Sequence, residues 1–172
     1  FMLLDNKNLL HKNFNSNISL NINKFSKDNI FDKANFLIEI QNGLIKFDNS
    51  IFISKKLGTL KILRSNIYTN DNKFFLNSEV LIDIHNQKKF YNTFQIPKSY
   101  RKNIKKIKFD FVTNITSGNT KIKSFYINDI ISNNLAKKIS EVIVNDNIDI
   151  NRNFNNWIVL KRIINSIVLQ IN

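Results

Sequence analysis

The sequence predicts a mainly β protein, built as an extended antiparallel sheet with one or two C-terminal α-helices. Runs in which apolar and polar residues alternate recur along most of the 172 residues, and a period of two is that of a half-buried strand. Each of the three glycines opens such a run, at Gly43, Gly58 and Gly118. Glycine tolerates positive φ, so these positions indicate turns that lead into strands, either as copies of one repeated unit or as the ordinary turns of an all-β protein.

The alternating runs predict a meander of about eight strands. In chain order they cover residues 17–25, 36–40, 44–47, 57–63, 76–84, 90–96, 107–112 and 121–127. Asn42-Gly43 between two runs is a strong hairpin signal. Pro97, the only proline, ends the run at 90–96 because it has no backbone donor for a sheet. The short connections favour antiparallel pairing.

Helical periodicity appears late in the chain. Leu135, Ile139, Val142 and Ile143 predict a short helix, and a second apolar stripe runs from Trp157 to Ile171. That stripe could pack on the sheet, plug its open end or lie on a membrane surface. We expect a β-rich region at 1–130 and a helical segment at 131–172.

The composition bears on nucleic-acid recognition, cysteine chemistry and membrane spans. The net charge is +13, but almost all of the positive charge is lysine; only four residues are arginine, the side chain that best recognises phosphates and bases. No cysteine is present, and no apolar run is long enough to span a membrane. The chain begins with Phe1 and lacks a signal-peptide pattern, so we expect it to be a piece of a longer protein whose membrane anchor lies elsewhere.

No catalytic or metal-binding pattern is present. His11 and His85 are the only histidines, and neither has neighbours suited to a ligand or general base. The sequence contains no phosphate-binding loop, nucleophile elbow or dinucleotide fingerprint. We therefore predict a protein without enzyme activity, cofactor or metal.

A basic cluster without an acidic residue lies between Pro97 and Phe109. It could form a helical turn over 98–106 and hold lipid head groups or nucleic-acid phosphates, or it could be a solvated connection. Its candidate head-group residues are Lys98, Arg101, Lys102 and Lys105.

The apolar residues of successive strands should share one face of the sheet, because each belongs to the apolar register of its run. The residues predicted to share this face include Ile18, Leu20, Ile22 and Ile122, together with the eight groove candidates that follow. The candidates for lining a groove are Ile38, Ile40, Leu60, Ile62, Val80, Ile82, Phe109 and Phe111.

Residues 17–128 resemble the C-terminal β-rich region of AsmA-like envelope proteins, a group that includes TamB-type and YhdP-type proteins of Gram-negative bacteria. The resemblance rests on residues 38–47 (IEIQNGLIKF), 58–62 (GTLKI) and 89–98 (KFYNTFQIPK), which lead into Arg101-Lys102. It implies a long, curved, groove-like antiparallel sheet at the periplasmic side of the inner membrane. The apolar groove would carry or shield phospholipid acyl chains and support outer-membrane biogenesis.

The expected partners are thus phospholipid acyl chains and other envelope proteins, with no nucleic acid. Two alternatives stay open: a basic nucleic-acid or ribosome-associated module, and a structural interaction domain. Aromatic residues interleaved with lysines on one strand face would favour nucleic acid. The recurrence of Lys46, Lys61 and Lys121 at one position of the glycine-led runs favours an apolar face with lysines opposite.

Overall fold

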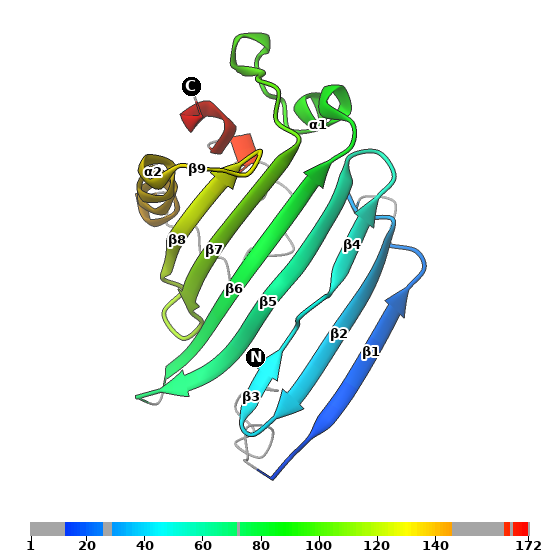
Figure 1. Cartoon of the computed structure of the whole chain (residues 1–172), viewed down its shortest axis with the longest axis vertical. Coiled ribbons are helices and arrows are strands. Elements are labelled where there is room, and N and C mark those ends of the chain that lie inside the picture. Colours follow the sequence, from blue (N-terminus) through cyan, green and yellow to red (C-terminus); the bar gives the residue numbers. More distant parts are fainter. Residues whose placement is uncertain (1–12, 26–28, 72, 146–163, 166, 172) are drawn as a thin grey trace.

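A computed structural model describes residues 13–25, 29–71, 73–145, 164–165 and 167–171 as one twisted antiparallel sheet with helices gathered at one end (Figure 1). This confirms the predicted fold class. The strands are β1 (Ser16–Ile22), β2 (Lys33–Gln41), β3 (Leu44–Lys46), β4 (Ile51–Ser54), β5 (Gly58–Asn70), β6 (Lys73–Ile84), β7 (Lys106–Asn114), β8 (Thr120–Ile127) and β9 (Ile130–Ile131). The helical elements are α1 (Gln87–Thr93), the 3-10 turn η1 (Lys98–Tyr100) and α2 (Asn133–Asn145).

The strands neighbour one another in chain order. The sheet runs β1-β2-β3-β5-β6-β7-β8-β9, and β4 also lies between β2 and β5, in line with β3. The predicted Asn42-Gly43 turn joins β2 to β3, and both residues have positive φ (52° and 76°), as a type I′ hairpin requires. The meander inferred from short connections is therefore present.

The strand register places the predicted apolar residues on one side of the sheet, which we call the apolar face. Ile18 pairs with Ile38, Leu60 with Ile82, Ile62 with Val80, and Val80 with Phe109. Directly paired residues point to the same side, and so do residues two apart on a strand. All twelve residues predicted to share a face fall in this register, including Phe111 opposite Ile122.

Two β-bulges preserve this arrangement. One extra residue on β5, Leu63, lies between Ile62 and Arg64, and another on β8, Lys123, lies between Ile122 and Ser124. Without such an extra residue the alternation beyond it would send apolar side chains to the opposite face. Arg64 instead pairs with Glu79 on the far side, and Ile67 pairs with Leu76 on the apolar face.

The main hydrophobic core lies where the helices cover the apolar face at the β6–β8 end. Phe125 and Ile107, both 1% exposed, meet Ile139 of α2 and Val168 of the C-terminal helical residues there. The β-rich and helical segments share this one cluster. A smaller cluster of Ile40, Ile45 and Ile67 lies toward the other end of the strands.

The prediction of a strand at 90–96 was wrong, because this segment forms α1 and the turn that follows it. The side-chain oxygen of Asn86 caps the helix by accepting a hydrogen bond from the Lys89 backbone N–H (2.9 Å). Phe90 and Phe94, four residues apart, then bury the same helical side against the core. Phe90, Phe94 and Ile96 also fit the alternation of a strand, which concealed the helical spacing in so short a run.

Of the two alternatives for 98–106, a helical turn or a solvated connection, the helical one is present only in its first turn. Only η1 is helical, and the chain then extends into β7. The extended path lets Ile104 and Ile107 (each 1% exposed) enter the core together. Tyr100, which a helix would have placed beside them, is 38% exposed.

The remaining predictions differ from the structure mainly in extent. The helix beginning near Leu135 is confirmed as α2. Of the stripe at 157–171, residues 164–165 and 167–170 are helical, and residues 157–163 lie outside the described residues. Two short strands, β4 and β9, and the second half of β5 were not predicted from the sequence.

Candidate functional site

The eight groove candidates lie together on the apolar face, but their surroundings differ. Ile40 and Val80 are buried, and the other six are half-buried. Ile82, Phe109 and Phe111 pack against the main core, and Ile38 packs against the smaller cluster. Among the residues that the structure describes, Leu60 and Ile62 belong to neither cluster, so they mark the stretch of the face between the two packed ends.

An aromatic cluster borders this stretch. Phe36 stacks on Phe47 with ring centroids 5.2 Å apart, and Phe52 lies 6.1 Å from Phe36. Phe52 pairs with Leu60 in the sheet. The middle of the apolar face is therefore lined by aliphatic and aromatic side chains from neighbouring strands.

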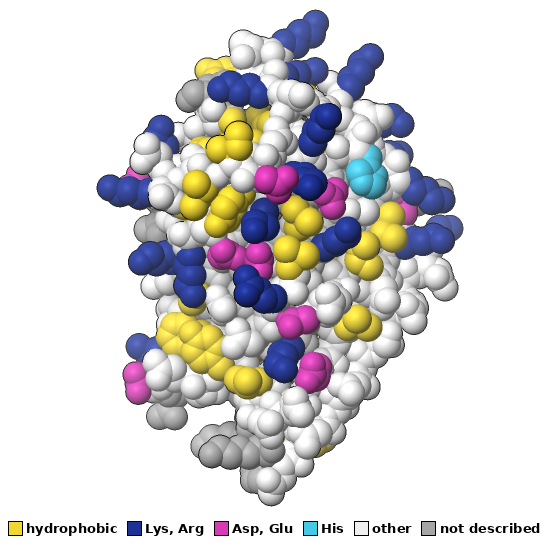
Figure 2. Space-filling view, viewed as in Figure 1, with side chains coloured by type: hydrophobic (Ala, Val, Ile, Leu, Met, Phe, Trp, Pro, Cys, Tyr) yellow, Lys and Arg dark blue, Asp and Glu magenta, His cyan; other side chains and the backbone are white. Residues whose placement is uncertain are grey.

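The opposite face carries the charged side chains, and Figure 2 shows acidic, basic and hydrophobic side chains intermingled over the middle of the sheet. Lys46, Lys61 and Lys121 all lie on this face, where they pair in register with Glu39, Leu81 and Val112. The lysines of the glycine-led runs are thus opposite the apolar face, as the sequence predicts.

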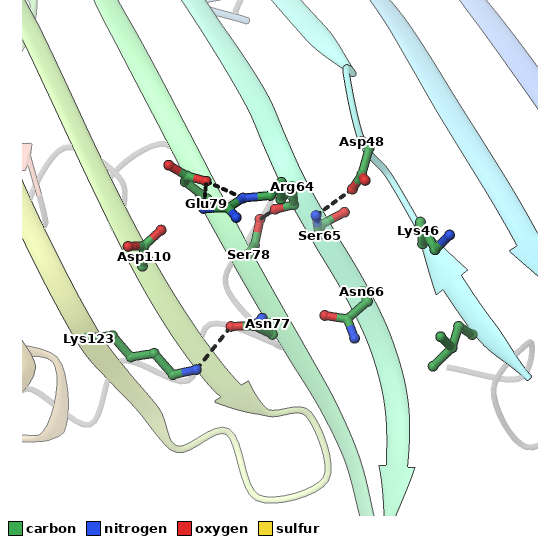
Figure 3. Close-up of a pocket in the computed structure, with 11 residues that line it drawn as sticks. Lys46, Asp48, Arg64, Ser65, Asn66, Asn77, Ser78, Glu79, Asp110 and Lys123 are labelled. Atoms are coloured by element: carbon green, nitrogen blue, oxygen red, sulfur yellow. Dashed lines mark hydrogen bonds and ion pairs between the residues drawn. The ribbon is translucent and has the colours of Figure 1, made fainter.

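A shallow pocket of about 450 Å³ opens on this charged face (Figure 3). It lies beside the β5 bulge and the break between β3 and β4. Asp48 bridges this break by accepting a hydrogen bond from the Ser65 backbone N–H (2.5 Å). The lining residues are Leu44, Lys46, Asp48, Arg64, Ser65, Asn66, Asn77, Ser78, Glu79, Asp110 and Lys123.

The charges of the side chains that line the pocket sum to zero. Three cations face three carboxylates, and Glu79 binds both Arg64 (2.6 Å) and, outside the pocket lining, Lys108 (3.4 Å). Lys123 donates to the Asn77 side-chain oxygen (3.3 Å), as Figure 3 shows. The lining is neutral in sum, but of its described residues only Arg64 and Glu79 form an ion pair with each other; Lys46 pairs with Glu39 outside the pocket. This network of ion pairs and hydrogen bonds could not be predicted from the sequence, because its members lie on four strands that only the pairing register brings together.

Glu79 is the most perturbed acid of this network. Burial by itself would raise its pKa, but the hydrogen bonds and charges of Arg64 and Lys108 outweigh burial and lower the pKa below the ordinary glutamate value. A carboxylate whose pKa is lowered in the folded state stabilises the fold above its unfolded pKa. That contribution is lost as the pH falls through the lowered value.

We therefore expect Glu79→Gln to reduce the free energy of unfolding by about 1 kcal/mol at neutral pH. The difference from the unaltered protein should shrink as the pH falls below about 4.5. Urea unfolding at several pH values measures it. Glu39→Gln is the matched control, because Glu39 pairs with Lys46 (3.4 Å) on the exposed surface. A pH-independent difference between the Glu79 variant and the unaltered protein would contradict this assignment.

The head-group candidates occupy the helical end of the molecule. Lys98, Lys102 and Lys105 are exposed. Arg101 is half-buried; its Nε donates to the Ile96 carbonyl (2.9 Å) and its guanidinium lies 5.8 Å from the centre of the Tyr91 ring. Arg101 thus helps to hold the loop together, whereas the three lysines remain available to solvent. These four residues lie between α1 and β7, at the end of the sheet where the Ile84 N–H donates to the Lys105 carbonyl (2.7 Å).

No metal-binding group of three or more His, Cys, Asp or Glu side chains occurs in the described part of the chain. His85 is exposed at the end of β6, and His11 lies outside the described residues. Among the helices that the structure describes, none is long and apolar enough to cross a membrane.

In the comparisons with known proteins, no family model, curated protein or solved structure matches this chain.

Proposed function

We propose that this chain is a non-enzymatic domain of the cell envelope that holds phospholipid acyl chains against the apolar face of its sheet. In this proposal it carries or shields lipid on the periplasmic side of the inner membrane and supports outer-membrane biogenesis. The observation that carries the proposal is the register that sets the apolar residues of β1 to β8 on one continuous face.

The middle of that face suits an acyl chain. Leu60 and Ile62 are half-buried and belong to neither hydrophobic cluster, and Phe52 pairs beside them. An acyl chain gains about 0.8 kcal/mol for each methylene that it buries. A row of aliphatic side chains across several strands can therefore bind a flexible chain without any directional polar contact.

The distribution of lysines favours lipid over nucleic acid. Lys46, Lys61 and Lys121 lie on the face opposite the apolar residues. A single-strand nucleic-acid platform instead combines exposed aromatic side chains with basic ones on one face. The resemblance of residues 17–128 to AsmA-like proteins adds the envelope location and the phospholipid to this proposal.

We expect the double variant Leu60→Asn, Ile62→Asn to bind a fluorescent phospholipid about tenfold more weakly than the unaltered protein. Loss of roughly 1.4 kcal/mol of apolar contact corresponds to that factor. Titration with the labelled lipid measures it. Neither residue belongs to a packed cluster, so the fold should survive, which circular dichroism can check.

The control is Leu81→Asn, because Leu81 is half-buried on the charged face opposite Lys61. It should leave lipid binding within about twofold. Equal weakening by the control, or no weakening by the double variant, would count against acyl binding on this face and favour a structural interaction domain.

A further inference from the structure

The most exposed large hydrophobic side chains of the described residues lie on β9. Ile130 is 74% exposed and Ile131 is 53% exposed. They directly follow a tight turn in which Asn128 and Asp129 both have positive φ (49° and 68°), the pattern of a type I′ hairpin. Two adjacent isoleucines left in water at a protruding turn need a physical reason.

Hydrogen bonds hold this turn firmly beside the basic cluster. The Asn128 side-chain oxygen accepts from the backbone N–H groups of Lys105 (2.7 Å) and Lys106 (3.1 Å). Its amide nitrogen donates to the Asn103 carbonyl (2.7 Å). The exposed isoleucines and the lysines are therefore parts of one ordered surface.

We call this surface the basic end; it comprises residues 86–106 and 127–132. It carries seven cations and one acid, a net charge of +6. The acid, Asp129, is paired with Lys106 (3.5 Å). Tyr100, which is 38% exposed, adds apolar surface to the basic end. Leu169 is 37% exposed and lies two residues before Ile171, whose carbonyl accepts a hydrogen bond from Lys102 Nζ (2.9 Å), so it adds apolar surface nearby. In Figure 1 these segments gather at the end of the sheet that carries α1 and the C-terminus.

This composition fits the surface of an anionic bilayer. Protruding aliphatic side chains can enter the boundary between head groups and acyl chains, and a surrounding group of lysines binds the anionic head groups. Nucleic acid fits less well. Its phosphates gain nothing from Ile130 and Ile131, and the one arginine of the basic end, Arg101, is engaged with the Ile96 carbonyl and the Tyr91 ring.

We propose that the basic end docks on the surface of an anionic membrane, with the β9 edge, which carries Ile130 and Ile131 on its two sides, inserted between head groups and with Lys98 and Lys105 bound to them. The lipid-binding stretch around Leu60 lies on the same sheet, so docking would bring it to a source or acceptor of lipid. This inference extends the proposed function, but its test measures attachment to the bilayer and not capture of a lipid. Either can therefore fail while the other stands.

The test is co-sedimentation with vesicles of phosphatidylcholine alone and of phosphatidylcholine mixed with phosphatidylglycerol. We expect binding to the anionic vesicles only, and weaker binding as salt is added. Ile130→Ser with Ile131→Ser, and separately Lys98→Gln with Lys105→Gln, should each weaken binding by about tenfold. All four side chains are exposed, so these changes should leave the fold intact.

Two controls match these variants. Phe14→Ser alters an exposed apolar residue that lies just before β1 and outside the strand register, at the other edge of the sheet. Lys73→Gln with Lys121→Gln removes the same charge from the start of β6 and of β8, away from the basic end. Both controls should bind as the unaltered protein does. Equal losses in the controls, an unaffected isoleucine variant, or tighter binding to an oligonucleotide than to the anionic vesicles would each overturn the proposal.

Discussion

Replacing Gly58 with alanine should lower the free energy of unfolding by about 3 kcal/mol or more, the range of severe backbone strain combined with overpacking. Gly58 opens β5 with φ at +145°, a conformation that side chains rarely allow. A Cβ atom there would lie 1.9 Å from the backbone carbonyl oxygen of Asp83 on the neighbouring strand. Neither backbone can move freely, because the His85 N–H donates to the Leu57 carbonyl (2.9 Å) across the same junction.

Urea unfolding measures the effect, with Gly118→Asn as the control. Gly118 lies in a turn at φ +77°, a left-handed conformation that asparagine tolerates. We expect that control to cost well under about 1 kcal/mol. A Gly58→Ala protein as stable as the control would contradict the close approach of β5 and β6 described above.

Truncating Phe125 to alanine should cost about 3 to 5 kcal/mol, as is usual for a fully buried phenylalanine. Phe125 is 1% exposed and lies in the cluster in which the sheet meets α2 and the C-terminal helical residues. Its ring also stacks near Phe109, with centroids 6.1 Å apart. The loss combines missing contacts with the cavity left behind, because the surrounding strands cannot close it.

Tyr126→Ala is the matched control from the adjacent position. Tyr126 points to the charged face, where the Lys108 ammonium lies 4.4 Å from its ring centre. Its removal should cost only about 1 kcal/mol. Thermal unfolding of both variants compares the stability lost on the apolar face with that lost on the charged face. Similar losses would contradict the difference in burial between the two faces, and a larger loss for Tyr126→Ala would mean that the faces have been assigned the wrong way round.

The faces of the sheet could be predicted from the sequence, since alternation alone fixes which residues share a side of a strand. The eight groove candidates were found in this way, and the register joins them. Burial within that face could not be predicted in the same way. Whether Ile62 or Ile82 is packed depends on where the helices lie, and periodicity carries no information about that.

The errors have a common physical origin. α1 was taken for a strand because Phe90, Tyr91 and Phe94 fit either period in so short a run, and the cap at Asn86 decided the outcome. The extended path after η1 follows from Ile104 entering a core that other segments create. The Glu79 network joins residues distant in sequence, so only the assembled sheet reveals it.

Lipid contact at the apolar face is tested most directly by site-specific photocrosslinking. A photoreactive phenylalanine analogue is placed at Ile62 on the apolar face or at Leu81 on the charged face, and the protein is illuminated in the presence of radiolabelled phospholipid. We expect crosslinks from position 62 and none above background from position 81, because the register puts these two residues on opposite sides of adjacent strands. Equal labelling at both positions, or labelling from position 81 alone, would contradict acyl binding on the apolar face.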